Sequence, residues 1–192
     1  MPQDAQQRSH AEQALRVFSA SADCIGQCRA VLDASSSSYA QLMAASSLNR
    51  IVVEFPTAPQ LKVDMRNYLL SYLYQKGPQL ASFVVTSLIQ LLCRVTKLGW
   101  YEADQHREIF EDACRFLQQG GNPSHTILGV KILAALVQEM NQPLPKRTIT
   151  EHRKIAINFR DTALFKVGRG GAGRHRHGGL AAAPPTIPVP VP

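Results

Sequence analysis

Apolar residues recur at intervals of three or four positions through most of the chain, the spacing that places side chains on one face of an α-helix. One such face comprises Leu42, Ala45, Leu48 and Val52. Capping signals support the pattern, since Ser9 stands three residues before Glu12, as in a capping box, and Pro123 suits the first turn of a helix. The pattern predicts eight helices, which begin near residues 9, 23, 38, 59, 78, 104, 123 and 148. No segment alternates for long enough to predict a strand.

The spacing of the predicted helices indicates that they form pairs. If the second, fourth, sixth and eighth helices are the second members of four pairs, they begin about 36 to 46 residues apart. This is close to the period of HEAT and armadillo repeats, in which each pair stacks on its neighbours to bury its apolar stripe. We therefore expect an all-α fold, a right-handed α–α superhelix of about four HEAT- or armadillo-like helix pairs over residues 9–165. An ordinary all-α bundle is the alternative.

The end of the chain differs in composition from the rest. Residues 166–192 contain Lys166, Arg169, Arg174 and Arg176 but no acidic residue, and they are rich in glycine and proline. Such a segment cannot bury enough apolar surface to offset the loss of chain entropy, so a disordered Gly/Arg/Pro-rich tail is predicted. Its glycines at 168, 170 and 173 match a dinucleotide-binding spacing, but no strand precedes them, so we reject that function.

Charge and hydropathy exclude two kinds of partner. The net charge is +7, and the tail holds four basic residues and no acid, so the body lacks the clustered positive charge of a nucleic-acid-binding face. We expect no specific nucleic-acid partner. The most apolar stretch, residues 80–93, is interrupted by polar residues and is shorter than the ~18 residues of a membrane span, so no membrane association is expected.

The reactive side chains do not form a recognisable site. Cys24, Cys28, Cys93 and Cys114 lack the further cysteine or histidine ligands that a zinc site needs, so we expect four reduced thiols buried in the core. No Ser-His-Asp or Cys-His set has a local signature either. The sequence therefore predicts no catalytic residue, no metal site and no cofactor, and we do not expect an enzyme.

Several strings in the sequence are specific enough to indicate a family. They are AEQALRVFSASADCIGQCRAVL, SSSYAQLMAASSLNRIV, DMRNYLLSYL, LIQLLCRVTKLGW and EHRKIAINFRDTALF. From about Ala11 to Phe165 the chain resembles the N-terminal repeats of the exportin seven and Ran-binding protein sixteen and seventeen family, within the importin-β superfamily of karyopherins. Residues 11–77 are similar to the importin-β N-terminal domain. The resemblance implies HEAT repeats and a receptor that carries protein cargo through nuclear pores with the GTPase Ran in its GTP form.

The same resemblance implies partners and a place in the cell. The implied partners are Ran-GTP, protein cargo and nucleoporins, in the nucleus, the cytoplasm and the nuclear pore complex. In such receptors Ran lies against the second helices of the N-terminal repeats, on the concave face. The candidate Ran-binding residues on the matching segments are Lys62, Arg66, Asn67, Arg107, Asp112 and Arg115. They lie off the apolar stripes, where charged and amide groups can pair with a charged GTPase surface. A solvated helix face is the alternative for each of them.

The chain departs from the family after Phe165. There the family continues with an apolar helix, whereas this chain turns to glycine, arginine, histidine and proline. We therefore expect a shortened or alternatively ended product, whose last helix lacks a packing partner. Cargo binding and export use the whole superhelix, of which about four repeats are present, and we expect Ran binding to be weak. The alternative function is a HEAT-repeat scaffold that binds a protein partner without Ran dependence.

Overall fold

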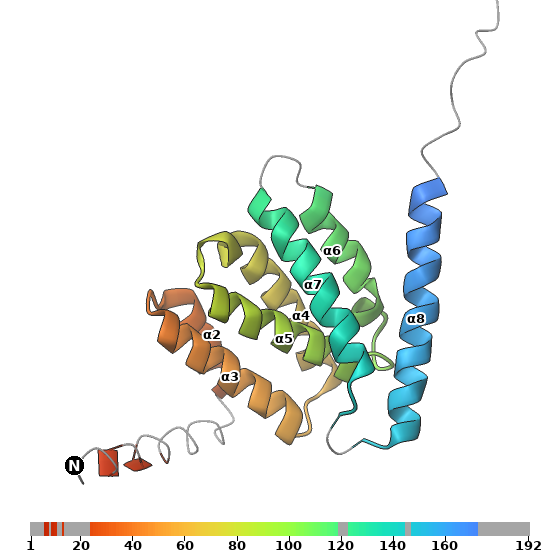
Figure 1. The fold of residues 1–192 in the computed structure, drawn as a ribbon. Coiled ribbons are helices and arrows are strands. Elements are labelled where there is room, and N and C mark those ends of the chain that lie inside the picture. Colours follow the sequence, from red (N-terminus) through yellow and green to blue (C-terminus); the bar gives the residue numbers. More distant parts are fainter. Residues whose placement is uncertain are drawn as a thin grey trace, which may run out of the picture.

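The computed structural model of the chain describes residues 6–7, 9–10, 13, 24–118, 123–144 and 147–172, with only the backbone described for 163–172. The described α-helices are α2 (Cys24–Ala34), α3 (Ser38–Glu54), α4 (Pro59–Lys76), α5 (Ser82–Leu98), α6 (Ile109–Gln118), α7 (Pro123–Asn141) and α8 (Ile149–Ala172) (Figure 1). Two 3-10 helices, η1 (Gly77–Gln79) and η2 (Asp104–Glu108), precede α5 and α6. The described part of the chain contains no strand, which confirms the predicted all-α class. The first predicted helix, near residue 9, lies largely outside the described residues.

Local sequence signals set several helix starts. Ser37 caps α3 by accepting a hydrogen bond, at 3.4 Å, from the backbone N–H three residues later. Pro59 and Pro123 are the first residues of α4 and α7, as predicted. Ahead of α8, the N–H of Glu151 donates to Thr148 Oγ1 at 3.2 Å, and the Glu151 carboxylate accepts from the Thr148 N–H at 3.0 Å. This is a complete capping box, so the predicted start near residue 148 is confirmed.

The helices form two layers (Figure 1). Helices α3, α5 and α7 lie side by side in the first layer, at the front of Figure 1, and α2, α4 and α6 lie behind them. Within the second layer, Tyr72 Oη in α4 donates to the carbonyl oxygen of Leu32 in α2 at 2.7 Å. Phe110 in α6 stacks on Phe159 in α8, with ring centroids 5.5 Å apart, so α8 continues this layer. The stacked layers confirm the predicted HEAT-like all-α class; the right-handed sense of the superhelix stays a prediction.

Small residues allow the two layers to approach closely. Between the two layers, backbones pack most extensively between α2 and α3, between α4 and α5, and between α6 and α7. Each of these contacts joins the second helix of one predicted pair to the first helix of the next, so the helices that pack most closely are not the two members of one predicted pair. Gly129 in α7 shows how the layers approach, because a Cβ there would lie 3.1 Å from the Ala113 carbonyl oxygen and 3.0 Å from Phe116 Cβ in α6. Successive pairs therefore depend on one another, as in a solenoid of repeats.

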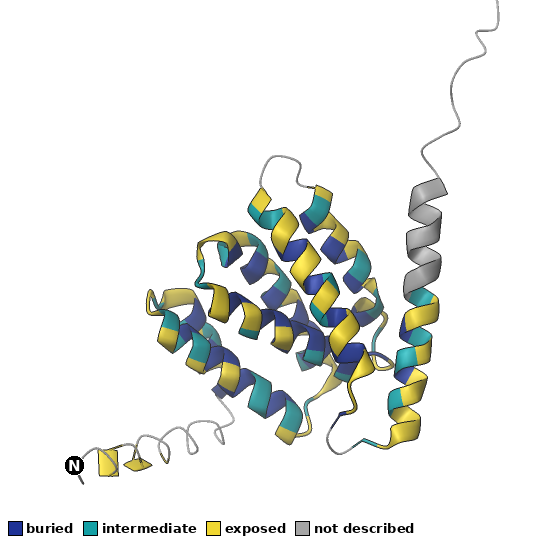
Figure 2. Cartoon of the chain, in the orientation of Figure 1, coloured by how far each residue is buried: buried dark blue, intermediate teal, exposed yellow. Residues whose placement is uncertain are grey.

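One apolar core runs between the layers from α2 to α8 (Figure 2). Trp100, after α5, is fully buried, and its ring meets Phe159 of α8 edge to face at 5.7 Å between centroids. Three of the four cysteines are buried, as predicted. Cys114 is exposed, so its prediction as a core thiol is wrong. It lies on the outer face of α6, whose inner face is formed by Ala113 and Phe116.

Helix α8 ends at Ala172, so it includes residues 166–172, where the disordered tail was predicted to begin. Burial of Ile155 and Phe159 fixes the first half of α8, and each residue added to an established helix gains a backbone hydrogen bond without a new nucleation cost. The glycines at 168, 170 and 171 weaken the helix by about 1 kcal/mol each relative to alanine, but they do not end it. The rest of the predicted tail, residues 173–192, lies outside the described residues.

Candidate functional site

The predicted site residues divide into buried and exposed ones, and Lys62 is buried. Its side chain extends from α4, the residue is 8% exposed, and its Nζ donates to both carboxylate oxygens of Glu102, at 2.6 and 2.7 Å. Glu102 lies between α5 and η2, so this ion pair joins α4 to the following repeat. The expectation of an exposed side chain is wrong for Lys62, because the chain after α5 covers this side of α4.

A second ion pair, one turn further along α4, is also buried. Arg66 is 3% exposed, and its guanidinium pairs with Asp112 Oδ2 in α6 and donates to Asn67 Oδ1 at 3.0 Å. The other oxygen of Asp112 accepts a hydrogen bond from Arg115 at 3.1 Å. Removing one partner of a buried pair leaves an uncompensated charge, which costs about 3–5 kcal/mol. Arg66 and Asp112 therefore hold α4 against α6, and any contact of theirs with a partner protein stays a prediction.

Two of the remaining candidates lie together at the surface. The Arg115 side chain is 74% exposed, and Asn67 is exposed on α4. Because Arg66 occupies Asn67 Oδ1, the amide N–H groups of Asn67 remain as donors for a partner. Arg107 lies apart from this group, in η2, where it pairs with Asp104. The structure thus brings Asn67 and Arg115 onto one α4–α6 face and places Arg107 in the turn before α6.

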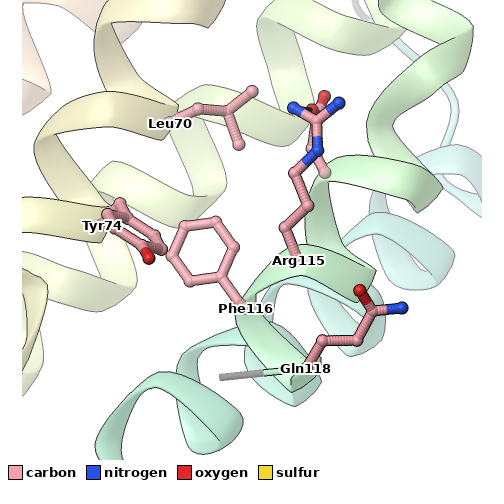
Figure 3. A pocket seen from close by; sticks show the side chains of 6 residues that line it. Leu70, Tyr74, Arg115, Phe116 and Gln118 are labelled. Carbon is pink, nitrogen blue, oxygen red and sulfur yellow. Dashed lines mark hydrogen bonds and ion pairs between the residues drawn. The ribbon is translucent and has the colours of Figure 1, made fainter.

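A hollow of about 470 Å³ opens beside Arg115 on the same face (Figure 3). It is lined by Leu70 and Tyr74 of α4 and by Asp112, Arg115, Phe116 and Gln118 of α6. The rings of Tyr74 and Phe116 meet edge to face, with centroids 5.4 Å apart, and Arg115 and Gln118 stand at the rim (Figure 3). The sequence alone did not reveal this hollow, because its two aromatic residues lie on helices that are distant in sequence.

His106 is a buried titratable residue next to the two ion pairs. It is fully buried in η2, and neither ring nitrogen has a hydrogen-bond partner among the described residues. Burial, together with the positive charges of Arg66 and Lys62, lowers its pKa to about 4, against an opposing effect of Glu102. The imidazole packs against Gly99, where a Cβ would overlap Nε2. His106 is therefore neutral near pH 7 and fills space behind the α4–α6 face.

A second groove crosses the first layer. Its volume is about 460 Å³, and it lies between α3, α5 and α7. Its lining includes the apolar Ile89 and four amide side chains, those of Asn49, Gln90, Gln138 and Gln142. Amide groups both donate and accept hydrogen bonds, so this groove offers chemistry that suits an extended peptide backbone.

Two other kinds of site were sought in the described ranges. Between residues 24 and 162, taking only the described side chains, no three His, Cys, Asp or Glu residues are placed to hold a metal ion together. Of the helices in the described part of the chain, none combines the length and the hydropathy that crossing a membrane requires. The surfaces of interest are therefore the α4–α6 face and the first-layer groove.

Comparison with known proteins shows what this chain is similar to. Residues 11–75 match the model of the importin-beta N-terminal domain. Over 170 residues, 85% of this chain, it is 42% identical to Exportin-7-A of Xenopus laevis. It is also 43% identical over 169 residues to Ran-binding protein 17 of Homo sapiens, and 39% identical over 166 residues to Ran-binding protein 16 of Drosophila melanogaster.

Residues 11–75 therefore match the importin-beta N-terminal domain, and most of the chain is similar to exportin and Ran-binding proteins. The similarity to exportin-7 and to Ran-binding proteins 16 and 17 confirms the resemblance seen in the sequence strings. The chain spans 15% of the length of each of these relatives.

Proposed function

We propose that this chain is the N-terminal part of a nuclear transport receptor of the exportin type, and that its α4–α6 face binds Ran in its GTP form. The observation that carries the proposal is the 43% identity to a protein named as Ran-binding, which extends over 85% of this chain. The face supports it as well, because it presents the exposed donors of Asn67 and Arg115 beside an apolar hollow. Exposed donors next to apolar surface are typical of protein interfaces.

The proposal extends to the receptor as a whole. Protein cargo and nucleoporins are its further proposed partners, in the nucleus, the cytoplasm and the nuclear pore complex. A chain that spans 15% of its relatives carries a small share of such an interaction surface, so we propose that it binds Ran-GTP more weakly than a whole receptor does. Binding of this kind requires complementary surfaces and no catalytic residue.

Titration of the full chain with Ran tests the proposal. The chain is titrated by calorimetry with Ran loaded with a non-hydrolysable GTP analogue, and separately with Ran-GDP. We expect heat of binding with the GTP form. The affinity for the GDP form should be weaker by a factor of about ten or more, and tenfold corresponds to ~1.4 kcal/mol of binding free energy. Equal affinity for both forms, or no binding of either, contradicts the proposal.

A matched pair of substitutions locates the surface. Asn67→Trp places a bulky ring on the α4–α6 face, and Gln138→Trp places the same ring on the first-layer groove. Both positions are exposed amides on helices. Asn67→Trp also removes the hydrogen bond that Arg66 donates to Asn67, so circular dichroism checks that both variants fold. Ran-GTP binding should fall with Asn67→Trp and persist with Gln138→Trp. The reverse result would indicate that Ran binds at the first-layer groove instead.

The second candidate function is a scaffold that binds a protein partner without Ran. The first-layer groove favours it, because four amide side chains there suit an extended peptide. In that case neither form of Ran binds, and a bound partner peptide is displaced by Gln138→Trp but not by Asn67→Trp.

A further inference from the structure

We propose that the hollow between α4 and α6 is an anchor site for an acidic segment of a partner protein, in which an aromatic or large aliphatic side chain lies next to a carboxylate. The hollow takes the apolar side chain, and Arg115 pairs with the carboxylate. This inference rests on the proposed function in one respect, since it takes the α4–α6 face as the surface that meets the partner.

The shape and lining of the hollow account for the apolar part of the ligand. Its volume of about 470 Å³ falls within the roughly 300–1,000 Å³ over which protein pockets hold ligands, so one large side chain fits. Tyr74 and Phe116 are arranged edge to face, and Leu70 stands opposite Arg115 (Figure 3). Phe116 is 3% exposed, so an added ring would contact chiefly the half-buried Tyr74 and Leu70. Aromatic rings favour offset or edge-to-face contact, which Tyr74 can provide.

The ion pairs beside the hollow account for the charged part. Both oxygens of Asp112 are engaged, one by Arg66 and one by Arg115, so a single carboxylate serves two guanidinium groups. The uncompensated positive charge lies on Arg115, because Arg66 is buried and Arg115 is exposed. Arginine has five N–H donors, so Arg115 can keep its bond to Asp112 while it binds a second carboxylate.

Three acetylated dipeptide amides test the chemistry of the hollow directly. Asp-Phe, Lys-Phe and Asp-Ser are titrated separately into the full chain, and the aromatic NMR resonances of Tyr74 and Phe116 are followed. Asp-Phe should shift both sets of resonances and bind about two- to fivefold more tightly than Lys-Phe, as expected for one exposed charge pair. Asp-Ser should bind at least roughly tenfold more weakly than Asp-Phe, because it lacks the buried ring.

Charge-neutralising variants complete the test. Arg115→Gln should weaken binding of Asp-Phe about two- to fivefold, and Lys131→Gln, an exposed cation of the first layer, should leave it unchanged. Both side chains are exposed, and circular dichroism checks that each variant folds. The inference is overturned if Asp-Phe leaves the Tyr74 and Phe116 resonances unmoved, or if Arg115→Gln leaves its affinity unchanged.

The same variants separate this inference from the proposed function. If the chain binds Ran-GTP but the dipeptides do not bind in the hollow, the anchor site is wrong and the proposed function stands. If Asp-Phe binds with the expected dependence on Arg115 and neither form of Ran binds, the anchor site stands and the Ran proposal is wrong.

Discussion

Replacing His106 with leucine should make the folding stability of this protein less sensitive to acid. The wild-type imidazole is fully buried, and neither of its nitrogens has a hydrogen-bond partner in the described part of the chain. Leucine has a similar volume and leaves no polar partner unsatisfied, so we expect it to cost less than about 1.5 kcal/mol at neutral pH. The difference between the two proteins should appear as the pH falls.

The magnitude follows from the pKa of His106. Burial and the neighbouring positive charges lower this pKa from 6.5 to about 4 in the folded protein. The unfolded chain therefore takes up a proton first as the pH falls, and the stability linked to His106 is complete above pH ~6.5 and is lost as the pH falls towards 4. A difference of about 2.5 in pKa corresponds to about 3.4 kcal/mol in total, of which about 2 kcal/mol is lost between pH 7 and pH 5.

Urea unfolding at pH 7 and pH 5 measures the effect. Trp100 is the single tryptophan of the chain and is fully buried, so its fluorescence reports unfolding. Carboxylates and the other histidines contribute to both proteins alike, so the comparison between them isolates His106. Wild type should lose about 2 kcal/mol more than His106→Leu between the two pH values. Parallel losses in the two proteins would refute the reasoning.

Two further substitutions test how the region around Trp100 is packed. Gly99→Ala should destabilise the fold by about 1–3 kcal/mol, because the new Cβ overlaps His106 Nε2. Urea titration of the double variant with His106→Ala should recover part of this loss, and strict additivity would argue against the overlap. Lys97→Met should cost about 1–3 kcal/mol, because the buried Lys97 Nζ donates to the carbonyl oxygens of Glu139, at 2.6 Å, and Gln142 at the end of α7. In Lys97→Met, the backbone amides in the last turn of α7 should exchange their hydrogens faster than in the wild type. Unchanged exchange there would contradict the idea that Lys97 caps the end of α7.

Sequence patterns predicted most helix positions because the signals that determine them are local. Proline at the first position of α4 and of α7, and the reciprocal bonds of Thr148 and Glu151 before α8, each involve residues within one turn of the helix start. The extent of α8 was not predicted, because composition alone does not show how far a helix that is packed at one end will continue.

The candidate site was harder to predict because its contacts are distant in sequence. Lys62 and Arg66 have the helical spacing of an exposed face, but their partners, Glu102 and Asp112, lie 40 and 46 residues further along the chain. Periodicity identifies the apolar face of a helix and does not identify which polar residues find a buried partner in the next repeat. The hollow beside Arg115 could not be predicted for the same reason, since α4 and α6 each supply part of its lining.

The burial of these ion pairs determines which substitutions report on partner binding. Changing Arg66 removes the partner of Asp112, so a loss of Ran binding would reflect a shifted α6 as readily as a lost contact. Changing Arg115 leaves the Arg66–Asp112 pair in place and alters only the exposed charge. The two buried pairs also fix how the second-layer helices follow one another, since each joins α4 to the next repeat. Exposed residues such as Asn67 and Arg115 can therefore vary with the partner, whereas Lys62, Arg66 and Asp112 hold the surface on which they stand.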